Sequence, residues 1–442
     1  MSFPALRSSA LRAQTTRAAP ALTRGYAAPS SSVFAVQDVN GIKVAAADQG
    51  LPTSSISVVV KAGSRYEPAP GVAHVLKNSL FKSTSKRSQI RLVRETEALG
   101  GVLSASLSRE HLVLTAEFLK GDEAFFAEAL GDAVTGPKLP LYEYNEQVVP
   151  QVAGEYEQAI HNSSVYAFDL AHQLAFRKGL GNSLFASPHT AVDHPTAVSF
   201  AKASFTPSNY AVFGSNVDAG KLQSLVSEFF VAGNSSSSPI SASASQYYGG
   251  EVRVPSVGHS STDQLLIAFK GAARSEVDFA VLRFLLGGDV FTKWGQGESP
   301  LAKLTTATTK AQAFNLAYSD AGLFGVSVSA KTADVTDAAQ KAIAALKEVA
   351  GGAKEEAVKR AVAQAKFAAA AALESRAGQV EVVGEQVVSN GQAPSLEEVF
   401  SQLDKVSVES LAKAASSALS SKPTTVAVGN THALPYADAL GL

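Results

Sequence analysis

The chain has 442 residues, of which 46% are hydrophobic and 17% are charged, and this length and composition suit about two to three well-packed globular domains. It contains no cysteine, which excludes disulfides, thiolate zinc sites and thiol nucleophiles. The net charge is −1 and no long basic run occurs, so nothing indicates a nucleic-acid partner.

The first 26 residues have the composition of a mitochondrial targeting presequence. They are rich in Ala, Ser and Thr and contain four arginines, whereas the first acidic residue of the chain is Asp38. Such a basic segment without acidic residues is typical of a matrix-targeting signal. A disordered basic tail is the alternative. The four arginines are Arg7, Arg12, Arg17 and Arg24.

A processing site is predicted between Tyr26 and Ala27, because Arg24 lies three residues before that cut. Loss of four of the 38 basic residues would leave 34 against 39 acidic ones, a net charge of −5. No apolar run approaches the roughly 18 to 20 residues that span a bilayer. We therefore expect the protein to reach a membrane only through its partners.

Strands and helices are both expected in the first half of the chain. Apolar runs of strand length occur at 42–47, 56–62, 112–119 and 210–214, and helical periods occur near 72–82, 88–99 and 143–161. In the second half, Thr336 is the predicted N-cap of a helix that Gly351 ends. The alanine-rich residues 354–372 are expected to be strongly helical. These mixed patterns indicate an α+β fold.

An internal repeat sets the domain organisation. Lys61 and Arg65, which follow one strand pattern, recur as Lys270 and Arg274, and both pairs are displaced by 209 positions. Self-similarity at a fixed offset is the signature of a duplicated unit.

The predicted domains are two homologous units joined by a linker. The same offset carries the strand at 112–119 to the apolar segment 321–328. Residues 232–246 are rich in Ser and Ala and lack an apolar period, which favours a flexible or extended linker. We predict one domain at 27–231 and the other at 247–442.

Several motifs in this order resemble the mitochondrial processing peptidase branch of the pitrilysin superfamily. The resemblance covers nearly the whole chain and implies two pitrilysin-like domains, each a mixed sheet packed with helices, which face each other as a bowl. The matching segments are Lys61-Ala62-Gly63-Ser64-Arg65-Tyr66-Glu67, Gly71-Val72-Ala73-His74, Phe81-Lys82-Ser83-Thr84, residues 314–325 and Arg376-Ala377-Gly378-Gln379.

The resemblance also identifies a degenerate metal site. Active members carry His-x-x-Glu-His, in which two histidines one helical turn apart bind zinc and the glutamate acts on the bound water. Here the segment reads His74-Val75-Leu76-Lys77-Asn78. A protonated lysine cannot be a general base, and an asparagine offers an amide in place of an imidazole. The family's third ligand, 77 positions after the second histidine, falls at Glu155, and we expect no metal to bind.

Two hypotheses describe Lys77. Its ammonium either replaces the missing cation and pairs with Glu155, because an unpaired buried carboxylate is costly, or both side chains reach solvent separately. His74 could still be a zinc ligand, but it and Glu155 fall short of the three protein ligands typical of catalytic zinc.

The remaining histidines show no ligand spacing. His189, Asp193 and His194 lie between prolines in a predicted loop, where nothing makes them converge. No Gly-x-Ser-x-Gly elbow occurs, and residues 295–297 lack the continuation of a phosphate loop. We expect no cofactor. The other histidines are His111, His161, His172, His259 and His432.

Three kinds of protein make up the branch: the catalytic peptidase subunit, its glycine-loop partner, and the large core subunits of respiratory complex III. The degenerate site argues against the first. Phe291 and Trp294 stand in the segment that corresponds to the glycine-rich loop, and large side chains restrict the conformational freedom on which such a loop depends.

The resemblance therefore implies a non-catalytic core subunit of complex III on the matrix side of the mitochondrial inner membrane. It would pair with a homologous core subunit, support the cytochrome subunits during assembly, and bind neither haem nor an iron-sulfur cluster itself. Two alternatives are a presequence-binding partner in a soluble processing peptidase and an active zinc peptidase.

Overall fold

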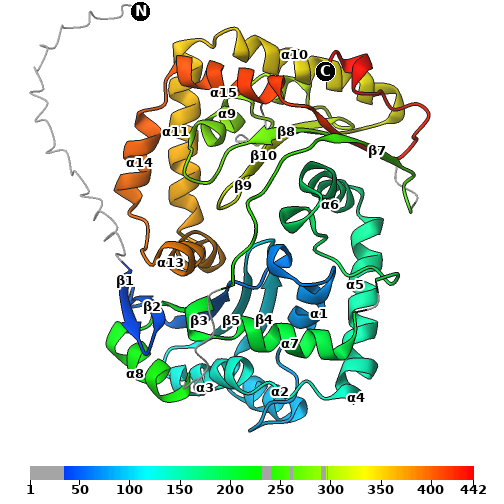
Figure 1. Ribbon diagram of the computed structural model, residues 1–442. Helices are drawn as coiled ribbons and strands as arrows, with labels where there is room; N and C mark the ends of the chain where they lie inside the picture. Colours follow the sequence, from blue (N-terminus) through cyan, green and yellow to red (C-terminus); the bar gives the residue numbers. More distant parts are fainter. Residues whose placement is uncertain (1–33, 191, 231–239, 259–261, 290–294, 296) are drawn as a thin grey trace, which may run out of the picture. The chain divides into compact units, whose positions relative to one another are not determined.

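The computed structural model describes residues 34–190, 192–230, 240–258, 262–289, 295 and 297–442 (Figure 1). The predicted cleavage site at Arg24, Tyr26 and Ala27 lies outside these residues, and so do Phe291, Trp294 and His259. We refer to residues 34–230 as the first half and to residues 240–442 as the second half. Both halves belong to one compact unit that runs from Val33 to Leu442.

A six-stranded mixed sheet forms the centre of the first half. Its strand order is β1-β2-β6-β3-β5-β4, and only β2 and β6 run parallel. The strands are β1 (Ala35–Val39), β2 (Ile42–Ala47), β3 (Thr53–Val60), β4 (Val102–Leu107), β5 (Leu112–Leu119) and β6 (Tyr210–Ser215). The four strands predicted from the sequence are all present, while β1 and β4 were not predicted.

The second half contains a five-stranded mixed sheet in the order β7-β11-β8-β10-β9, in which only β7 and β11 run parallel. This order repeats β2-β6-β3-β5-β4 of the first sheet strand for strand. Equivalent strands begin between 208 and 214 positions apart, for example Thr53 of β3 and Asp263 of β8, which confirms the internal repeat. The strands are β7 (Gly250–Val254), β8 (Asp263–Gly271), β9 (Lys310–Ala317), β10 (Gly322–Ala330) and β11 (Thr424–Val428).

Helices surround both sheets. Those of the first half are α1 (Val72–Ser79), α2 (Gln89–Ala98), α3 (Glu123–Thr135), α4 (Leu141–Glu143), α5 (Val149–His161), α6 (Ser163–Phe176), α7 (His194–Ser204) and α8 (Ala219–Phe229). Those of the second half are α9 (Asp278–Leu286), α10 (Thr332–Ala350), α11 (Glu355–Ala372), α12 (Arg376–Gln379), α13 (Glu385–Asn390), α14 (Leu396–Asp404) and α15 (Val408–Ser420).

Shorter helical turns connect these elements. The π-helical turns η2 (Tyr144–Val148) and η6 (Val380–Gly384) continue directly into α5 and α13. The 3-10 turns are η1 (Ser64–Tyr66), η3 (Gly179–Gly181), η4 (Pro207–Asn209), η5 (Ala302–Leu304) and η7 (Asp438–Leu440). In the described part of the chain, no helix combines the length and the apolarity that crossing a membrane requires.

Three helix boundaries differ from the sequence-based expectation. Thr336 is not an N-cap, because α10 begins one turn earlier, at Thr332, and Asp334 in its first turn favours that start. The helix expected to reach residue 82 ends at Ser79, since Leu80 is extended and Phe81 has a φ of 58°. The helix expected at 143–161 begins at Leu141 and includes the π-helical turn η2.

The central strand of each sheet is buried on both faces. In β3, Ile56 and Val58 point into one core, while Val59 points into another on the opposite face. In β8, Ile267 and Leu266 divide in the same way. Alternate residues of a strand face opposite sides, which explains why both strands contain consecutive apolar residues, 58–60 in β3 and 265–269 in β8.

Each half covers one face of the other half's sheet. Helix α6 of the first half packs its alanines on the second sheet, and η6 with α13 of the second half packs its valines on the first sheet (Figure 1). The alanines recur every fourth residue, which gives α6 one smooth face. The contacts join Ala167, Ala171 and Ala175 to Leu266, Ala268 and Val426, and Val380, Val383 and Val387 to Val59, Ala211 and Phe213.

This exchange of helices ties the two halves together through two apolar interfaces. The domain limits predicted at 27–231 and 247–442 remain a prediction. Helix α6 lies in the first half of the chain but packs on the second sheet, and α13 lies in the second half but packs on the first sheet. Within the predicted linker, residues 240–246 adopt no helix or strand.

Candidate functional site

Two helices position the residues of the predicted metal site. Helix α1 carries His74, Lys77 and Asn78, and helix α5, which packs against it, carries Glu155. The chain enters α1 through Gly71, whose φ of 87° is one that glycine adopts readily. Glu67 then accepts a hydrogen bond from the backbone N–H of Ala73 at 3.1 Å, which satisfies one free donor of the helix start.

Three donors on α1 converge on a single oxygen of Glu155. Its Oε2 accepts hydrogen bonds from His74 Nε2 at 2.6 Å, from Lys77 Nζ at 2.7 Å and from Asn78 Nδ2 at 3.1 Å. The side chain of Lys77 is 21% exposed and that of Glu155 is 27% exposed. Of the two hypotheses for Lys77, the structure therefore shows the ion pair between its ammonium and the Glu155 carboxylate.

His74 is held as a neutral hydrogen-bond donor. Its Nδ1 accepts the backbone N–H of Ala186 at 3.1 Å, so the ring proton is assigned to Nε2, which donates to Glu155. Burial lowers the pKa of His74 below its ordinary value and outweighs the opposing hydrogen bond with Glu155. The ring also meets Phe185 edge-on, with centroids 5.6 Å apart.

Glu155 is held as a carboxylate. Burial by itself would raise its pKa, but the hydrogen bonds from Lys77, His74 and Asn78 outweigh that cost and lower the pKa to about 2. The site is therefore one carboxylate neutralised by one ammonium, with two neutral donors beside them.

These four residues do not fit a zinc ion. Catalytic zinc takes three protein ligands, whereas His74 and Glu155 are the only zinc-type ligands here. The Nε2 atom of His74 donates a proton in place of a lone pair, and the Lys77 ammonium already neutralises the carboxylate. Across the residues that the structure describes, no set of three His, Asp or Glu side chains could hold a metal ion.

The charge on Glu155 should make stability depend on pH. Its folded pKa of about 2 lies below the ordinary 4.5, so its stabilisation is present above about pH 4.5 and is lost as the pH falls toward 2. We expect Glu155→Gln to lower the free energy of unfolding at neutral pH by about 1 kcal/mol, because the pair is partly exposed.

Urea unfolding of both proteins between about pH 6 and about pH 3.5 would measure this difference, which should shrink at the acid end. Glu157→Gln is the matched control, since Glu157 is exposed and lies on the same helix. A difference for Glu155→Gln that stays constant with pH would contradict the depressed pKa.

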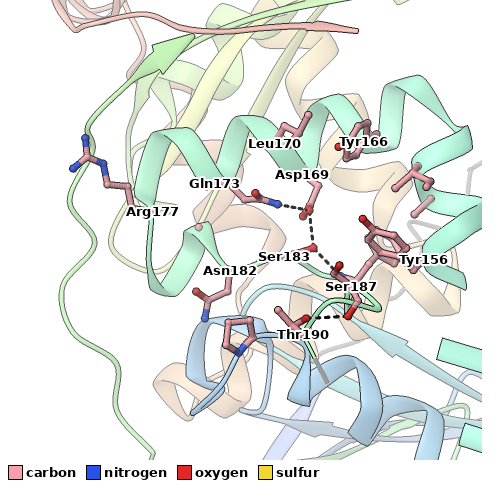
Figure 2. A pocket seen from close by; sticks show the side chains of 15 residues that line it. Tyr156, Tyr166, Asp169, Leu170, Gln173, Arg177, Asn182, Ser183, Ser187 and Thr190 are labelled. Atoms are coloured by element: carbon pink, nitrogen blue, oxygen red, sulfur yellow. Dashed lines mark hydrogen bonds between the residues drawn. The ribbon is translucent and has the colours of Figure 1, made fainter. Parts of the chain in front are cut away.

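A cavity of about 550 Å³ lies beside this site, lined by α5, α6 and the segment 181–190. Figure 2 shows Asp169 on its wall, hydrogen-bonded to Gln173 and Ser183 at 2.9 and 2.7 Å. Behind the wall, Arg109 pairs with Asp169 at 2.8 Å, and both residues are buried. Sequence reasoning missed this pair, because the partners are 60 positions apart with no motif around either.

Four of the other histidines have side-chain contacts in the structure. His161 and His172 each donate Nδ1–H to the carbonyl four residues earlier, at 2.6 Å, and His194 Nε2 contacts the carbonyl of Leu139 at 2.6 Å. The Nδ1 atom of His111 lies 3.3 Å from Glu385 Oε1. His189, Asp193 and His432 are exposed.

Fold and site together define a duplicated α+β protein in which the helices α1 and α5 are joined through the carboxylate of Glu155. Residues 43–187 match the family described as Insulinase (Peptidase family M16), and residues 191–365 match the family described as Peptidase M16 inactive domain. The duplication seen in the two sheets thus agrees with two domains of one family.

Similar proteins indicate the subgroup of this family to which the chain belongs. The chain is 45% identical to cytochrome b-c1 complex subunit 2, mitochondrial, of Cryptococcus neoformans, over 88% of this chain and 90% of that protein. It is 37% identical to the same subunit of Neurospora crassa, over 99% and 98%. It is 30% identical to a probable mitochondrial-processing peptidase subunit alpha-1 of Arabidopsis thaliana, over 91% and 82%. The chain belongs to the M16 peptidase family, in the group of the cytochrome b-c1 complex subunit 2 proteins.

Proposed function

We propose that the protein is a structural subunit of mitochondrial complex III, the core 2 subunit, which assembles and stabilises the quinol:cytochrome c oxidoreductase without catalysing a reaction. The observation that carries this proposal is the 45% identity, over nearly the whole chain, to a relative named as subunit 2 of that complex. The protein is mitochondrial, as the names of its relatives indicate.

The geometry of the former metal site supports the absence of catalysis. Hydrolysis at such a site needs a metal that activates water and a carboxylate that accepts its proton. Here Lys77 stands at the position of that carboxylate and Asn78 at the position of a ligand. His74, Lys77, Asn78 and Glu155 therefore serve as a helix-to-helix contact between α1 and α5.

The expected partners are the homologous core 1 subunit and the cytochrome and other subunits of complex III. A permanent pairing of two homologous subunits normally buries a large and relatively apolar interface. We place the protein on the matrix side of the inner membrane, where it would associate with the membrane through these partners. It would need no cofactor and no nucleic acid.

A second candidate is a presequence-binding partner subunit of the mitochondrial processing peptidase. The relative named as an alpha subunit of that enzyme motivates it. Its identity of 30% is lower than the 45% and 37% found for the complex III subunits of the two fungi named above. This candidate predicts a soluble heterodimer that binds presequence peptides.

Co-purification after mild detergent extraction distinguishes the two candidates. We expect the tagged full chain to be recovered with b-type and c-type haem absorbance, because the partners carry those groups. The same extraction with the tag on an unrelated matrix protein is the control. Recovery as a haem-free heterodimer with a peptidase subunit would overturn the proposal.

A further inference from the structure

A cluster of charged and polar side chains lies where the two halves meet, with buried members in the first half and exposed members in the second. We call Arg65, Glu110, Ser319 and Asp320 the axis cluster. The first two belong to the first half, and the last two lie in the turn between β9 and β10 of the second half. Arg65 is 7% exposed and Glu110 is 3% exposed.

The hydrogen bonds of the cluster cross between the halves. Arg65 grips Asp320 with both terminal nitrogens, Nη1 to Oδ1 at 2.8 Å and Nη2 to Oδ2 at 2.6 Å. Glu110 pairs with Arg65 at 2.7 Å and accepts the backbone N–H of Ser319 at 3.1 Å and its hydroxyl at 2.5 Å. Charge-assisted bonds of this kind, above all the two-pronged arginine fork, are both strong and directional.

The cluster joins two turns that are equivalent in the internal repeat, the β4–β5 turn and the β9–β10 turn. Glu110 and Ser319 are 209 positions apart, the same offset that relates the two repeats, so each turn contacts its own equivalent. The equivalent of Arg65 is Arg274, which pairs at 2.8 Å with Glu385, and that carboxylate also lies 3.3 Å from His111 of the first half. Two related polar contacts therefore join the halves, in addition to hydrogen bonds such as that from Arg376 to the carbonyl of Thr53 at 2.8 Å.

Apolar contacts alone would not fix how the halves sit together. The alanines of α6 and the valines of η6 and α13 give the halves a large attraction, but apolar packing is not directional and tolerates small sliding movements. The Arg65 fork and the Ser319 hydrogen bonds are lost if either turn shifts, and the buried Arg65 and Glu110 would then lack these partners, which is costly for buried charges.

We propose that the axis cluster is a conformational lock, which holds the two halves in one relative arrangement and makes the subunit a rigid scaffold. The lock rests on the contacts of Arg65 and Glu110 with the 319–320 turn, and it does not depend on the function proposed above. Buried polar groups that specify one arrangement are known in other proteins.

A distance measurement across the halves tests the lock. The chain has no cysteine, so Glu97→Cys on α2 and Gln340→Cys on α10, both exposed, give two labelling sites, one in each half. Pulsed electron spin resonance on the labelled full chain would report the distribution of distances between them.

Loss of the Asp320 carboxylate should release the lock. In Asp320→Ala and in the isosteric Asp320→Asn, we expect the distribution to widen by about twofold or to split into two populations. The side chain of Asp320 is 31% exposed. Asparagine has the same shape as aspartate, so the distance measurement can be made on Asp320→Asn if Asp320→Ala does not fold. Distributions as narrow as that of the parent in every folded variant would overturn the proposal.

Asp404→Ala is the matched control. Asp404 accepts two hydrogen bonds from Lys366, both at 2.6 Å, and both residues belong to the second half. Removal of this pair should leave the distance distribution unchanged. Equal broadening in the control would show a general loosening in place of a lock, and would also overturn the proposal.

Discussion

The double substitution Lys77→Glu and Asn78→His is expected to create a zinc site that binds one metal ion per chain. His74 and Asn78 already approach the same oxygen of Glu155 at 2.6 and 3.1 Å, so an imidazole at position 78 would bring three ligands within reach of one ion. The substitution also removes the ammonium that neutralises Glu155. Metal analysis after dialysis against zinc would measure the stoichiometry.

The restored site should hold zinc more weakly than an intact one. Binding through Nε2 moves the proton of His74 to Nδ1, which sacrifices the hydrogen bond from the Ala186 N–H. Lys77→Glu alone is the control and should remain metal-free, because it leaves only His74 and Glu155 as family ligands. A metal-free double variant would contradict our description of the site as an otherwise intact ligand arrangement.

Arg109→Met is expected to destabilise the protein by about 3 to 5 kcal/mol, the usual cost of leaving one partner of a buried ion pair alone. Arg109 is 4% exposed and Asp169 is 6% exposed. The guanidinium pairs with Asp169 at 2.8 Å and also donates to the carbonyl oxygens of Leu180 and Asn182 at 3.1 and 2.5 Å. Arg109 therefore holds the segment 180–182, which precedes Ala186, the residue whose N–H donates to His74. Urea or thermal unfolding would measure the loss.

Two further variants separate charge burial from a simple loss of side-chain volume. Arg109→Met with Asp169→Leu should be more stable than Arg109→Met alone, because no carboxylate is then buried without its cation. Arg94→Met, at an exposed position, should change stability by less than about 0.5 kcal/mol. A cost below about 1 kcal/mol for Arg109→Met would show that water reaches Asp169 and compensates its charge.

The elements that the sequence predicts well are those whose pattern is local. Strands β2, β3, β5 and β6 read as apolar runs, and the alanine-rich α11 lies within one residue of its predicted start. The repeat offset of 209 predicted two homologous halves, and the two sheets do share one strand order. Such features depend on neighbours within a few residues or on comparison of the chain with itself.

Features that depend on distant partners could not be predicted. Nothing in the pattern of α6 indicates that its alanines face the second sheet in place of the first. The proton position on His74 is set by Ala186, 112 residues away, and the Arg65 fork binds Asp320, 255 residues away. For the Lys77 and Glu155 pair, the residues and a charge argument gave the hypothesis, but only the structure chose between pairing and separate exposure.

The central claim is that the scaffold of a metallopeptidase persists here without its reaction. The most direct test measures zinc content and cleavage of a presequence peptide with the same preparation of the purified full chain. We predict less than about one tenth of a zinc ion per chain, because two of the expected three ligands are present, and no cleavage above background. Stoichiometric zinc together with chelator-sensitive cleavage of the peptide would contradict the account.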